Sequence, residues 1–313
     1  MLHSRHDWAT AIARKKNGLA APKIYYLHPL MAGPLSEWPR HVERCRELGF
    51  DHLGCAPLFA PGRSGDIFLT ADHEAANPAL HADGPADRII GTLAQTCAAH
   101  GLKLILDVVL DRVAVDACMG KPASAWFRAV DLGEARADPR SMRARGDAAY
   151  ARFEDDAAAN ALAAWWSERL IRLAHLGVAG FRCEAPHKVP AGAWRRIIGA
   201  VRRRSAGCRF LAWTPGLDWS QGAALAGVGF DAVFSSVAWW DGRASWFVEA
   251  NERLRRVAPV IACPEAPFGN RLAARLDPNS DVHGAYRHAL RRAAATGSGL
   301  MVPMGFEFAT ARA

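Results

Sequence analysis

Short apolar runs alternate with longer amphipathic stretches along almost the whole chain. The clearest run is "LKLILDVVL" at residues 102–110, which is nearly continuous in apolar residues, as expected of a strand buried on both faces. Repeated alternation of strands and helices forces right-handed crossovers and a parallel sheet. Eight expected strands cover residues 23–30, 51–57, 102–110, 178–184, 208–213, 230–236, 258–263 and 298–303. Expected helices cover residues 37–48, 86–101, 159–177, 191–205, 245–257 and 284–296.

Eight such units in 313 residues favour a closed (β/α)8 TIM barrel over an open doubly wound α/β sheet. We expect residues 1–20 to be an N-terminal extension and residues 21–313 to form the barrel. Residues 111–158 are too many for an ordinary loop, so they predict a small excursion after the third strand. Only about ten residues follow the eighth strand, so the last βα unit is expected to be incomplete. Residues 7–16 are a candidate to pack in place of its helix.

Composition narrows the class of protein. The net charge of +8 comes mostly from scattered arginines; no basic stripe is interleaved with aromatic residues, so no nucleic-acid partner is expected. An anionic ligand such as a sugar phosphate fits this charge. Seven cysteines without a C-x-x-C pair predict reduced, buried thiols and no metal site. No apolar window approaches the roughly 18 residues of a membrane span, and the N-terminus lacks a signal-peptide core. These features predict a soluble, cytoplasmic protein without a membrane partner.

In a (β/α)8 barrel the functional residues stand at the C-terminal ends of the strands. Asp107 ends the third expected strand, Arg182 and Glu184 end the fourth, and Glu265 follows the seventh. Such carboxylates suit cleavage through an oxocarbenium-like state, in which one attacks or stabilises positive charge and an arginine keeps it ionised. A plain salt bridge between Glu184 and Arg182 is the structural alternative. Further rim positions are Trp213, Ser235, Ser236 and Glu307.

Several segments carry a family resemblance. "LILDVVLDR" (104–112), "GVAGFRCEA" (177–185) and "ADHEAANPAL" (71–80) resemble conserved segments of the α-amylase superfamily, glycoside hydrolase family 13. Within it, the chain is most similar to the bacterial maltosyltransferases that extend α-1,4-glucan from maltose 1-phosphate. The similar segments are "RCEAPHKVP" (182–190), "FLAWTP" (210–215), "LAGVGF" (225–230), "ACPE" (262–265) and "PMGFE" (303–307). Their order and spacing agree with that group.

The resemblance implies roles for the rim residues. Glu184 stands at the position of the nucleophile and Glu265 at that of the transition-state stabiliser, where the family has aspartate at both. Trp213 stands where the family has the glutamate that acts as general acid. Asp107 and Arg182 are kept as in the family.

Other positions complete the comparison with the family. The resemblance implies substrate-binding roles for Asp107 and His187. Asp111 and Arg112 replace the Asn-His of the first signature, and Lys188 lies one position early compared with the maltosyltransferases. No cofactor or metal site is expected.

The residue at position 213 bears most directly on catalysis. An indole N–H does not give up its proton near neutral pH, whereas general acid catalysis typically supplies roughly 10²–10⁴-fold in rate. The extra methylene of Glu184 shifts a carboxylate by more than ~1 Å, and a misplacement of that size costs roughly 10²-fold. We therefore expect impaired glucan hydrolysis, least so for a substrate with an anionic leaving group. Asp218 and Asp241 lie on the same rim as substitute acids.

Three functions remain open on this basis. The first is an impaired amylase-like barrel that binds α-1,4-glucan or serves as a structural module, with a competent maltosyltransferase domain as its partner. The second is an active, divergent retaining glycosyltransferase or glycoside hydrolase acting on maltosyl phosphate or α-1,4-glucan. The third is a protein-interaction scaffold without sugar binding. The tryptophans at the rim suit a sugar, because flat aromatic faces pack against its C–H surfaces; they are Trp213, Trp219, Trp239 and Trp240.

Overall fold

The computed structural model describes residues 21–117, 123–129, 147–277 and 279–311. The expected N-terminal extension, with residues 7–16, lies outside these ranges. Within them, the elements follow one another in the alternating order that the apolar runs predict.

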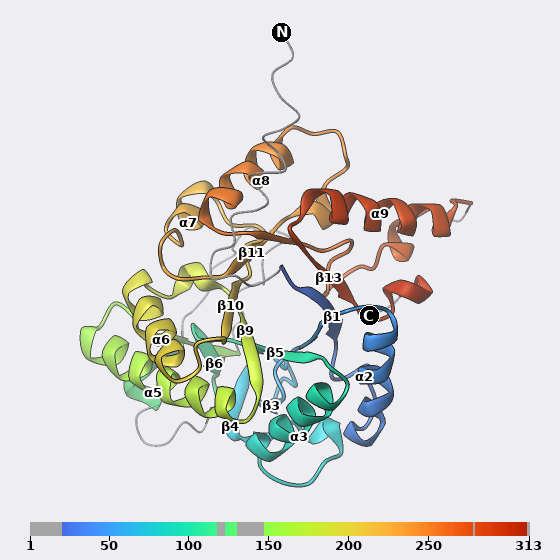
Figure 1. Cartoon of the computed structure of the whole chain (residues 1–313). Helices are drawn as coiled ribbons and strands as arrows, with labels where there is room; N and C mark the ends of the chain where they lie inside the picture. Colours follow the sequence, from blue (N-terminus) through green and yellow to red (C-terminus); the bar gives the residue numbers. More distant parts are fainter. Residues whose placement is uncertain (1–20, 118–122, 130–146, 278, 312–313) are drawn as a thin grey trace.

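Eight parallel strands close into a barrel, which confirms the predicted fold (Figure 1). Each strand is hydrogen-bonded to the next around the ring, and β1 pairs with both β2 and β13, so that no edge is left open. In spatial order the strands are β1 (Lys23–Leu27), β13 (Gly299–Pro303), β12 (Val260–Ala262), β11 (Ala232–Phe234), β10 (Arg209–Ala212), β9 (Val178–Cys183), β5 (Lys103–Val108) and β2 (His52–Cys55).

The helices lie outside the ring of strands (Figure 1). Six of the described helices match the predicted segments, and a short additional helix, α7 (Trp219–Ala223), follows β10. The six are α2 (Trp38–Glu47), α3 (Ala86–Ala99), α5 (Asp156–His175), α6 (Ala191–Arg204), α8 (Trp246–Val257) and α9 (Val282–Thr296). The sequence did not predict α7, because its five residues are too few to show a helical period.

Two small antiparallel sheets flank the barrel. The connection after β2 contains a hairpin of β3 (Phe59–Pro61) and β4 (Thr70–Ala76), which the sequence analysis did not predict. The predicted excursion after β5 contains a three-stranded sheet in the order β6-β8-β7 and a short helix, α4. Their bounds are Arg112–Ala114 for β6, Ala123–Trp126 for α4, Phe127–Ala129 for β7 and Ala148–Ala151 for β8. Residues 118–122 and 130–146 of the excursion are outside the description.

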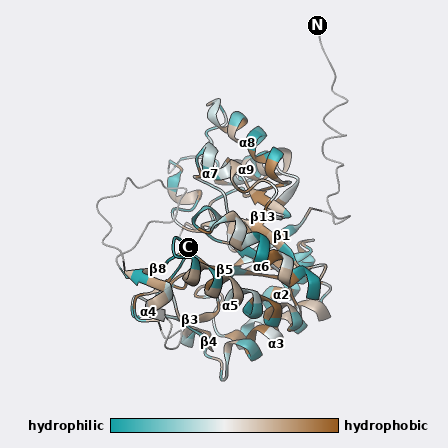
Figure 2. Cartoon of the chain, turned by 90° about the vertical axis from the view of Figure 1, so that its left-hand side faces the viewer, coloured by the Kyte–Doolittle hydropathy of each residue, from teal (hydrophilic) through white to brown (hydrophobic). Residues whose placement is uncertain are grey.

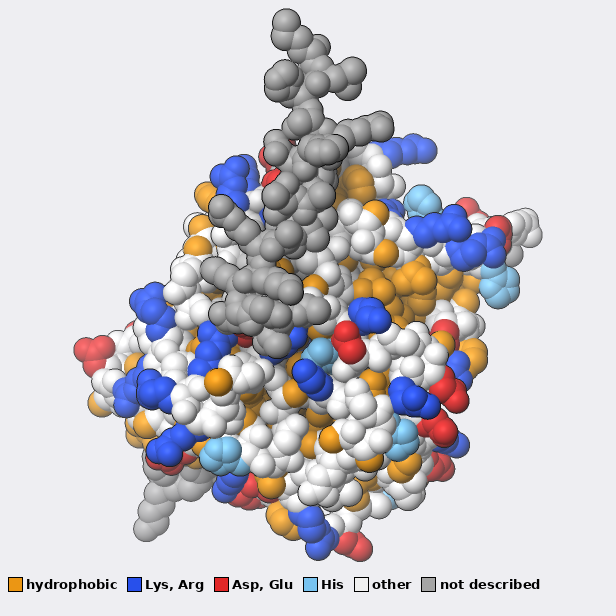
Figure 3. Space-filling model, viewed as in Figure 1, with side chains coloured by type: hydrophobic (Ala, Val, Ile, Leu, Met, Phe, Trp, Pro, Cys, Tyr) orange, Lys and Arg blue, Asp and Glu red, His pale blue; other side chains and the backbone are white. Residues whose placement is uncertain are grey.

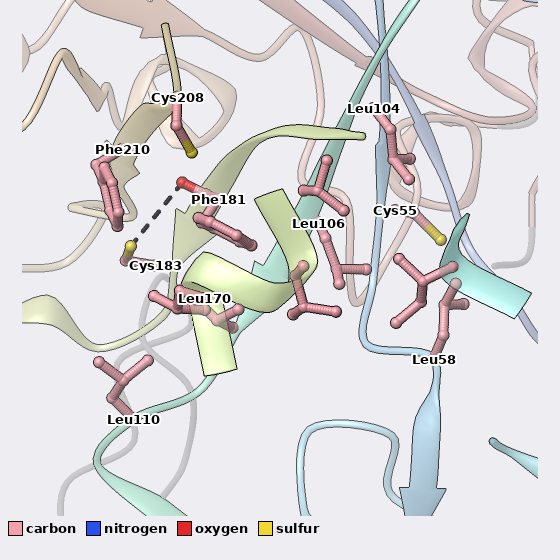
Figure 4. Packing of buried hydrophobic residues seen from close by; sticks show 14 of the residues in the cluster. Cys55, Leu58, Leu104, Leu106, Leu110, Leu170, Phe181, Cys183, Cys208 and Phe210 are labelled. Atoms are coloured by element: carbon pink, nitrogen blue, oxygen red, sulfur yellow. Dashed lines mark hydrogen bonds between the residues drawn. The ribbon is translucent and has the colours of Figure 1, made fainter. Parts of the chain in front are cut away.

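The apolar residues form two main layers. One lies between the strands and the surrounding helices, where Leu170 of α5 packs near Phe181 of β9 (Figure 4). The other fills the inside of the barrel and includes Ile24, Ile105 and Met301, which are at most 1% exposed. Inward and outward residues alternate along the strands because successive side chains of a strand point to opposite faces. In Figure 2 hydrophobic residues, in brown, gather around β1 and β13, while the helices also carry hydrophilic residues, in teal.

After β13 the described chain continues only into a 3-10 turn, η7 (Phe306–Phe308). The turn lies against β1 and α2, since Glu307 accepts a hydrogen bond from the hydroxyl of Tyr25 and an ion-pair contact from Arg44. The incomplete last βα unit stays a prediction.

The surface and the cysteines can be compared with the compositional expectations. On the face drawn in Figure 3, Lys and Arg side chains are scattered over the centre and the edge, interspersed with acidic ones, and do not form one stripe. The six cysteines in the described ranges are free and buried; Cys118 lies outside them. Among the described helices, none combines the length and apolar character needed to cross a membrane. The described residues also contain no cluster of three or more His, Cys, Asp or Glu side chains suited to a metal ion.

Candidate active site

Asp107 and Arg182 meet at the C-terminal mouth of the barrel. They are register partners on the adjacent strands β5 and β9, so their side chains point to the same, inner side. Arg182 donates from Nε to Asp107 Oδ1 at 2.7 Å and from Nη2 to the other carboxylate oxygen. The hydroxyl of Tyr26, from β1, also donates to Asp107. Three strands thus hold one fully buried ionic centre.

Glu184 joins the same arginine from the other side. Its Oε1 lies 2.8 Å from Arg182 Nη1, and its backbone N–H donates to Val108 at the end of β5. Burial raises the pKa of Glu184 and of Asp107, while the guanidinium of Arg182 opposes that rise. Arg182 therefore pairs with both Asp107 and Glu184. The pair with Glu184 is the salt bridge that the structural alternative predicts.

A second arginine, Arg112 on β6, completes the charge arrangement. Arg112 is buried and lies 2.8 Å from Asp111, and its charge acts on Glu184. The sequence resemblance compares these two residues with the Asn-His of the family signature. The buried ion network therefore consists of two arginines and three carboxylates: Arg112, Arg182, Asp107, Asp111 and Glu184.

Aromatic rings surround the guanidinium of Arg182. Its central carbon lies 4.6 Å from the ring centroid of Trp213, 4.9 Å from that of Tyr26 and 5.9 Å from that of Phe268. Such distances suit cation–π attraction, which is stronger where water is excluded. Trp213, which the sequence resemblance compares with a general acid, is 8% exposed and also packs against Phe234. The position that resembles the proton donor is therefore part of an apolar wall.

Glu265 is buried, but its carboxylate is bound by the loop that follows it. Oε1 lies 2.7 Å from Arg271 Nη2, and Oε2 accepts a hydrogen bond of 2.6 Å from the backbone N–H of Leu272. The hydroxyl of Tyr286 on α9 lies 3.5 Å from the same oxygen. These partners differ from those of Glu184, so the two acids at the family's carboxylate positions are held by separate groups.

The two candidate substitute acids cap local structure. Asp218 accepts from the backbone N–H of Gln221 as the N-cap of α7, and Asp241 accepts from the N–H groups of Arg243 and Ala244. Hydrogen bonds from backbone N–H groups lower the pKa of both carboxyls. A carboxyl that is stabilised as the anion is a poor proton donor near neutral pH.

The rim tryptophans do not form one common surface. Trp240 stacks on Phe247 at 4.5 Å between ring centroids and donates from Nε1 to the carbonyl of Ala244. Trp239 packs against the barrel interior, and Trp219 is 51% exposed beneath the guanidinium of Arg253. Their predicted binding of substrate stays a prediction.

The remaining candidates divide between the mouth and the outside of the barrel. His187 is half-buried, and burial lowers its pKa. The charges of Lys188, Asp111 and Asp218 act on it, so it lies at the mouth.

Ser235 is buried at the end of β11, with Ser236 next to it. Glu307 contacts Tyr25 and Arg44 on the outer side instead.

Sequence reasoning missed several residues of this arrangement. Tyr26 donates to Asp107, and Arg271 pairs with Glu265. Phe268 lies over the guanidinium of Arg182, and Phe68 packs edge-on against Phe268. The alternation in "KIYYL" could have placed Tyr26 inside the barrel. Phe268 and Arg271 lie on an irregular loop without a period, so their positions depend on tertiary contacts.

The arrangement can be compared with known proteins. No family model matches the chain. An α-1,4-glucan:maltose-1-phosphate maltosyltransferase of Burkholderia pseudomallei (strain K96243) is 39% identical over 289 residues, which are 92% of this chain and 25% of that protein. The chain therefore spans about a quarter of the length of the curated relative that it matches.

Solved structures with the same barrel have low sequence identity. The α-amylase from Geobacillus thermoleovorans, complexed with acarbose, superposes with a TM-score of 0.73 at 14% identity, covering 93% of this chain and 71% of that one. The α-amylase from Lactobacillus plantarum gives 0.68 at 17% identity, covering 93% and 72%. The α-glucosyl transfer enzyme XgtA gives 0.73 at 14% identity, covering 93% and 68%. These likenesses concern the fold.

Proposed function

We propose that this chain, which is 39% identical over 289 residues to a glucan maltosyltransferase and shares the barrel of an α-amylase, is a catalytically silent barrel domain of α-glucan metabolism. In this proposal the inherited ion network stabilises the barrel mouth. The domain acts alongside a competent maltosyltransferase domain, in the same or another polypeptide. The similarity to one quarter of a maltosyltransferase supports this association.

The observation that carries the proposal is that an indole, Trp213, lies where the sequence resemblance expects a proton-donating glutamate. The indole packs on Arg182 and Phe234, so neither its chemistry nor its surroundings provide a proton for a leaving sugar oxygen. Asp218 and Asp241 are stabilised as anions by backbone N–H groups. Neither of these two candidate acids on the rim therefore replaces the missing proton donor.

The two remaining acids support the same proposal. Glu184 shares Arg182 with Asp107 and is 2% exposed, whereas Glu265 is bound to Arg271 and Leu272. A retaining mechanism needs a carboxylate aimed at the sugar and an acid about 5–5.5 Å from it. Buried carboxylates that are already paired with arginines or backbone N–H groups favour a structural role.

Maltosyl transfer tests the proposal with the most favourable donor. The purified protein is incubated with maltose 1-phosphate and maltohexaose, and released phosphate is measured. We expect release about 10⁴-fold or more below that of a competent maltosyltransferase, because Glu184 is displaced and Trp213 provides no general base to deprotonate the acceptor hydroxyl. Phosphate release well above a protein-free blank that disappears in Glu184→Gln would refute a silent domain. A matched variant with Trp213→Glu, Glu184→Asp and Glu265→Asp tests whether restoring the family's acids at these three positions is enough to restore phosphate release.

A further inference from the structure

The loop between β12 and α9 places one aromatic ring over the ion network. Phe268 contacts three rings from two other segments: Phe68 at 4.9 Å, and Tyr26 at 5.6 Å and His28 at 5.7 Å in and just after β1, measured between centroids and all edge-on. We propose that Phe268 is a plug that controls access to Arg182 and Glu184, and that Glu265 is a positioning residue that holds this plug in place. This inference rests on the proposed silent domain and states how its mouth is closed.

The position of Phe268 in the layers of the mouth supports a plug. Asp107, Arg182 and Glu184 are 0%, 1% and 2% exposed, whereas Phe268 is only partly buried. The next residue, Gly269, is exposed. Phe268 is therefore an outer ring of the aromatic enclosure, and its ring centroid lies 5.9 Å from the guanidinium carbon of Arg182. Removing it would open one side of the arginine to water.

Glu265 holds the base of the loop. Its two oxygens contact Arg271 Nη2 at 2.7 Å and the N–H of Leu272 at 2.6 Å, so the carboxylate closes the loop on itself. Arg271 also donates to the carbonyl of Met304 at 3.0 Å, which fastens the loop to the chain after β13. The side chains of Glu265 and Arg271 are 0% and 2% exposed, and hydrogen bonds with one charged partner are roughly twice as strong as those between neutral groups.

The backbone between anchor and plug needs a specific conformation. Gly269 has φ of +98°, a region that residues with a Cβ rarely adopt. It lies directly after Phe268 and two residues before Arg271, and it therefore lets the chain turn back from the ring to the anchor. In this loop, Phe268 packs over the mouth of the barrel, whereas Arg271 and Leu272 are bound by the carboxylate of Glu265.

Chemical labelling of carboxyl groups tests the plug independently of turnover. The folded protein is treated with a water-soluble carbodiimide and glycine ethyl ester, and labelling is measured at each carboxyl by peptide mass spectrometry. Glu249, whose side chain is 65% exposed, provides the internal reference. In the wild type we expect Glu184 to be labelled far more slowly than Glu249, because it is sealed.

Phe268→Ala should raise the labelling rate of Glu184 at least about tenfold without changing that of Glu249, since loss of a packed ring favours local opening. Phe308→Ala is the matched control, because Phe308 is 64% exposed and contacts Arg44 on the outer side. Glu265→Gln should raise Glu184 labelling as well, while Glu265→Asp should raise it less.

An unchanged Glu184 rate in Phe268→Ala would overturn the plug. Circular dichroism establishes that the variant is folded; if it is not, Phe268→Leu is used, with an expected smaller rise and the same criterion. Equal labelling in wild type and Glu265→Gln would overturn the positioning role alone. A protein that transfers maltosyl groups but keeps Glu184 sealed by Phe268 would contradict the silent domain and leave the plug standing.

Discussion

At the residue scale, Arg182 is the centre of the molecule's electrostatics. It is 1% exposed and is shared by Asp107, on the adjacent strand β5, and by Glu184, directly after its own strand β9. Burying such an arrangement is costly unless each charge has a partner. The spacing of Arg182 and Glu184, two residues apart, predicted their common face, since alternate residues of a strand point the same way.

Replacing the cation should be far more damaging than neutralising one anion. We expect Arg182→Met to lower the free energy of unfolding by about 3–5 kcal/mol, because two buried carboxylates lose their partner. Glu184→Gln should cost less, about 1 kcal/mol, since Arg182 keeps Asp107. Urea denaturation measures both. Arg243→Met, at an exposed site, is the control, and an Arg182→Met effect no larger than this control would contradict the account.

At the element scale, the β3–β4 hairpin is attached to α5 by an aromatic cluster. The ring of His73 on β4 lies 5.1 Å from Trp165 and 5.3 Å from Trp166 of α5, and 5.2 Å from Phe59 of β3. Arg169 of α5 donates to the carbonyl of His73 and lies 2.6 Å from Glu74. Burial lowers the pKa of His73 to about 3, so this attachment requires the neutral imidazole.

The attachment should weaken in acid. The folded-state pKa of about 3 lies below the unfolded value of 6.5, so the stability from neutral His73 is full above pH 6.5. It is lost as pH falls toward 3, by about 1.4 kcal/mol per pH unit. Between pH 7 and pH 5 the wild type should therefore lose about 2 kcal/mol more than His73→Phe, measured by urea denaturation. His288→Phe, on the exposed side of α9, should keep the acid sensitivity of the wild type. Equal pH dependence in wild type and His73→Phe would refute this role.

At the scale of the whole molecule, the barrel depends on close contact between its first and last strands. A Cβ added at Gly299 of β13 would lie 2.8 Å from the carbonyl oxygen of Pro22 and 3.2 Å from Ile261. Gly299 faces the residue that leads into β1, so this position is where the ring closes. The absence of a side chain there is a requirement of the closed topology.

A side chain at residue 299 should lower the stability of the whole barrel. We expect Gly299→Ala to destabilise the protein by about 1–3 kcal/mol, because backbone atoms must move apart, and Gly299→Val to cost more. Gly207→Ala is the matched control, since an added Cβ there meets nothing within 4 Å. Differential scanning calorimetry should show a lower Tm for Gly299→Ala than for Gly207→Ala. Equal Tm values would mean that the closure tolerates a side chain.

Prediction from sequence succeeded where local pattern decides structure. All eight barrel strands and six helices followed from apolar runs and helical periodicity, because each must bury its own face. The β3–β4 hairpin and α7 were missed, since Thr70–Ala76 is polar at several positions and α7 has only five residues. Short elements of this kind are stabilised by neighbours rather than by their own pattern.

The amino-acid sequence by itself determined the barrel, the position of Asp107, Arg182 and Glu184 at its mouth, and the indole in place of an acid at residue 213. These features follow from strand order and from chemical identity, which local sequence contains. Only the tertiary structure decided which groups hold each carboxylate: Arg182 for Glu184, and Arg271 with Leu272 for Glu265. It also decided that Phe268 lies over the arginine. Such pairings join residues from different loops and strands, and their geometry arises only when the ring has closed.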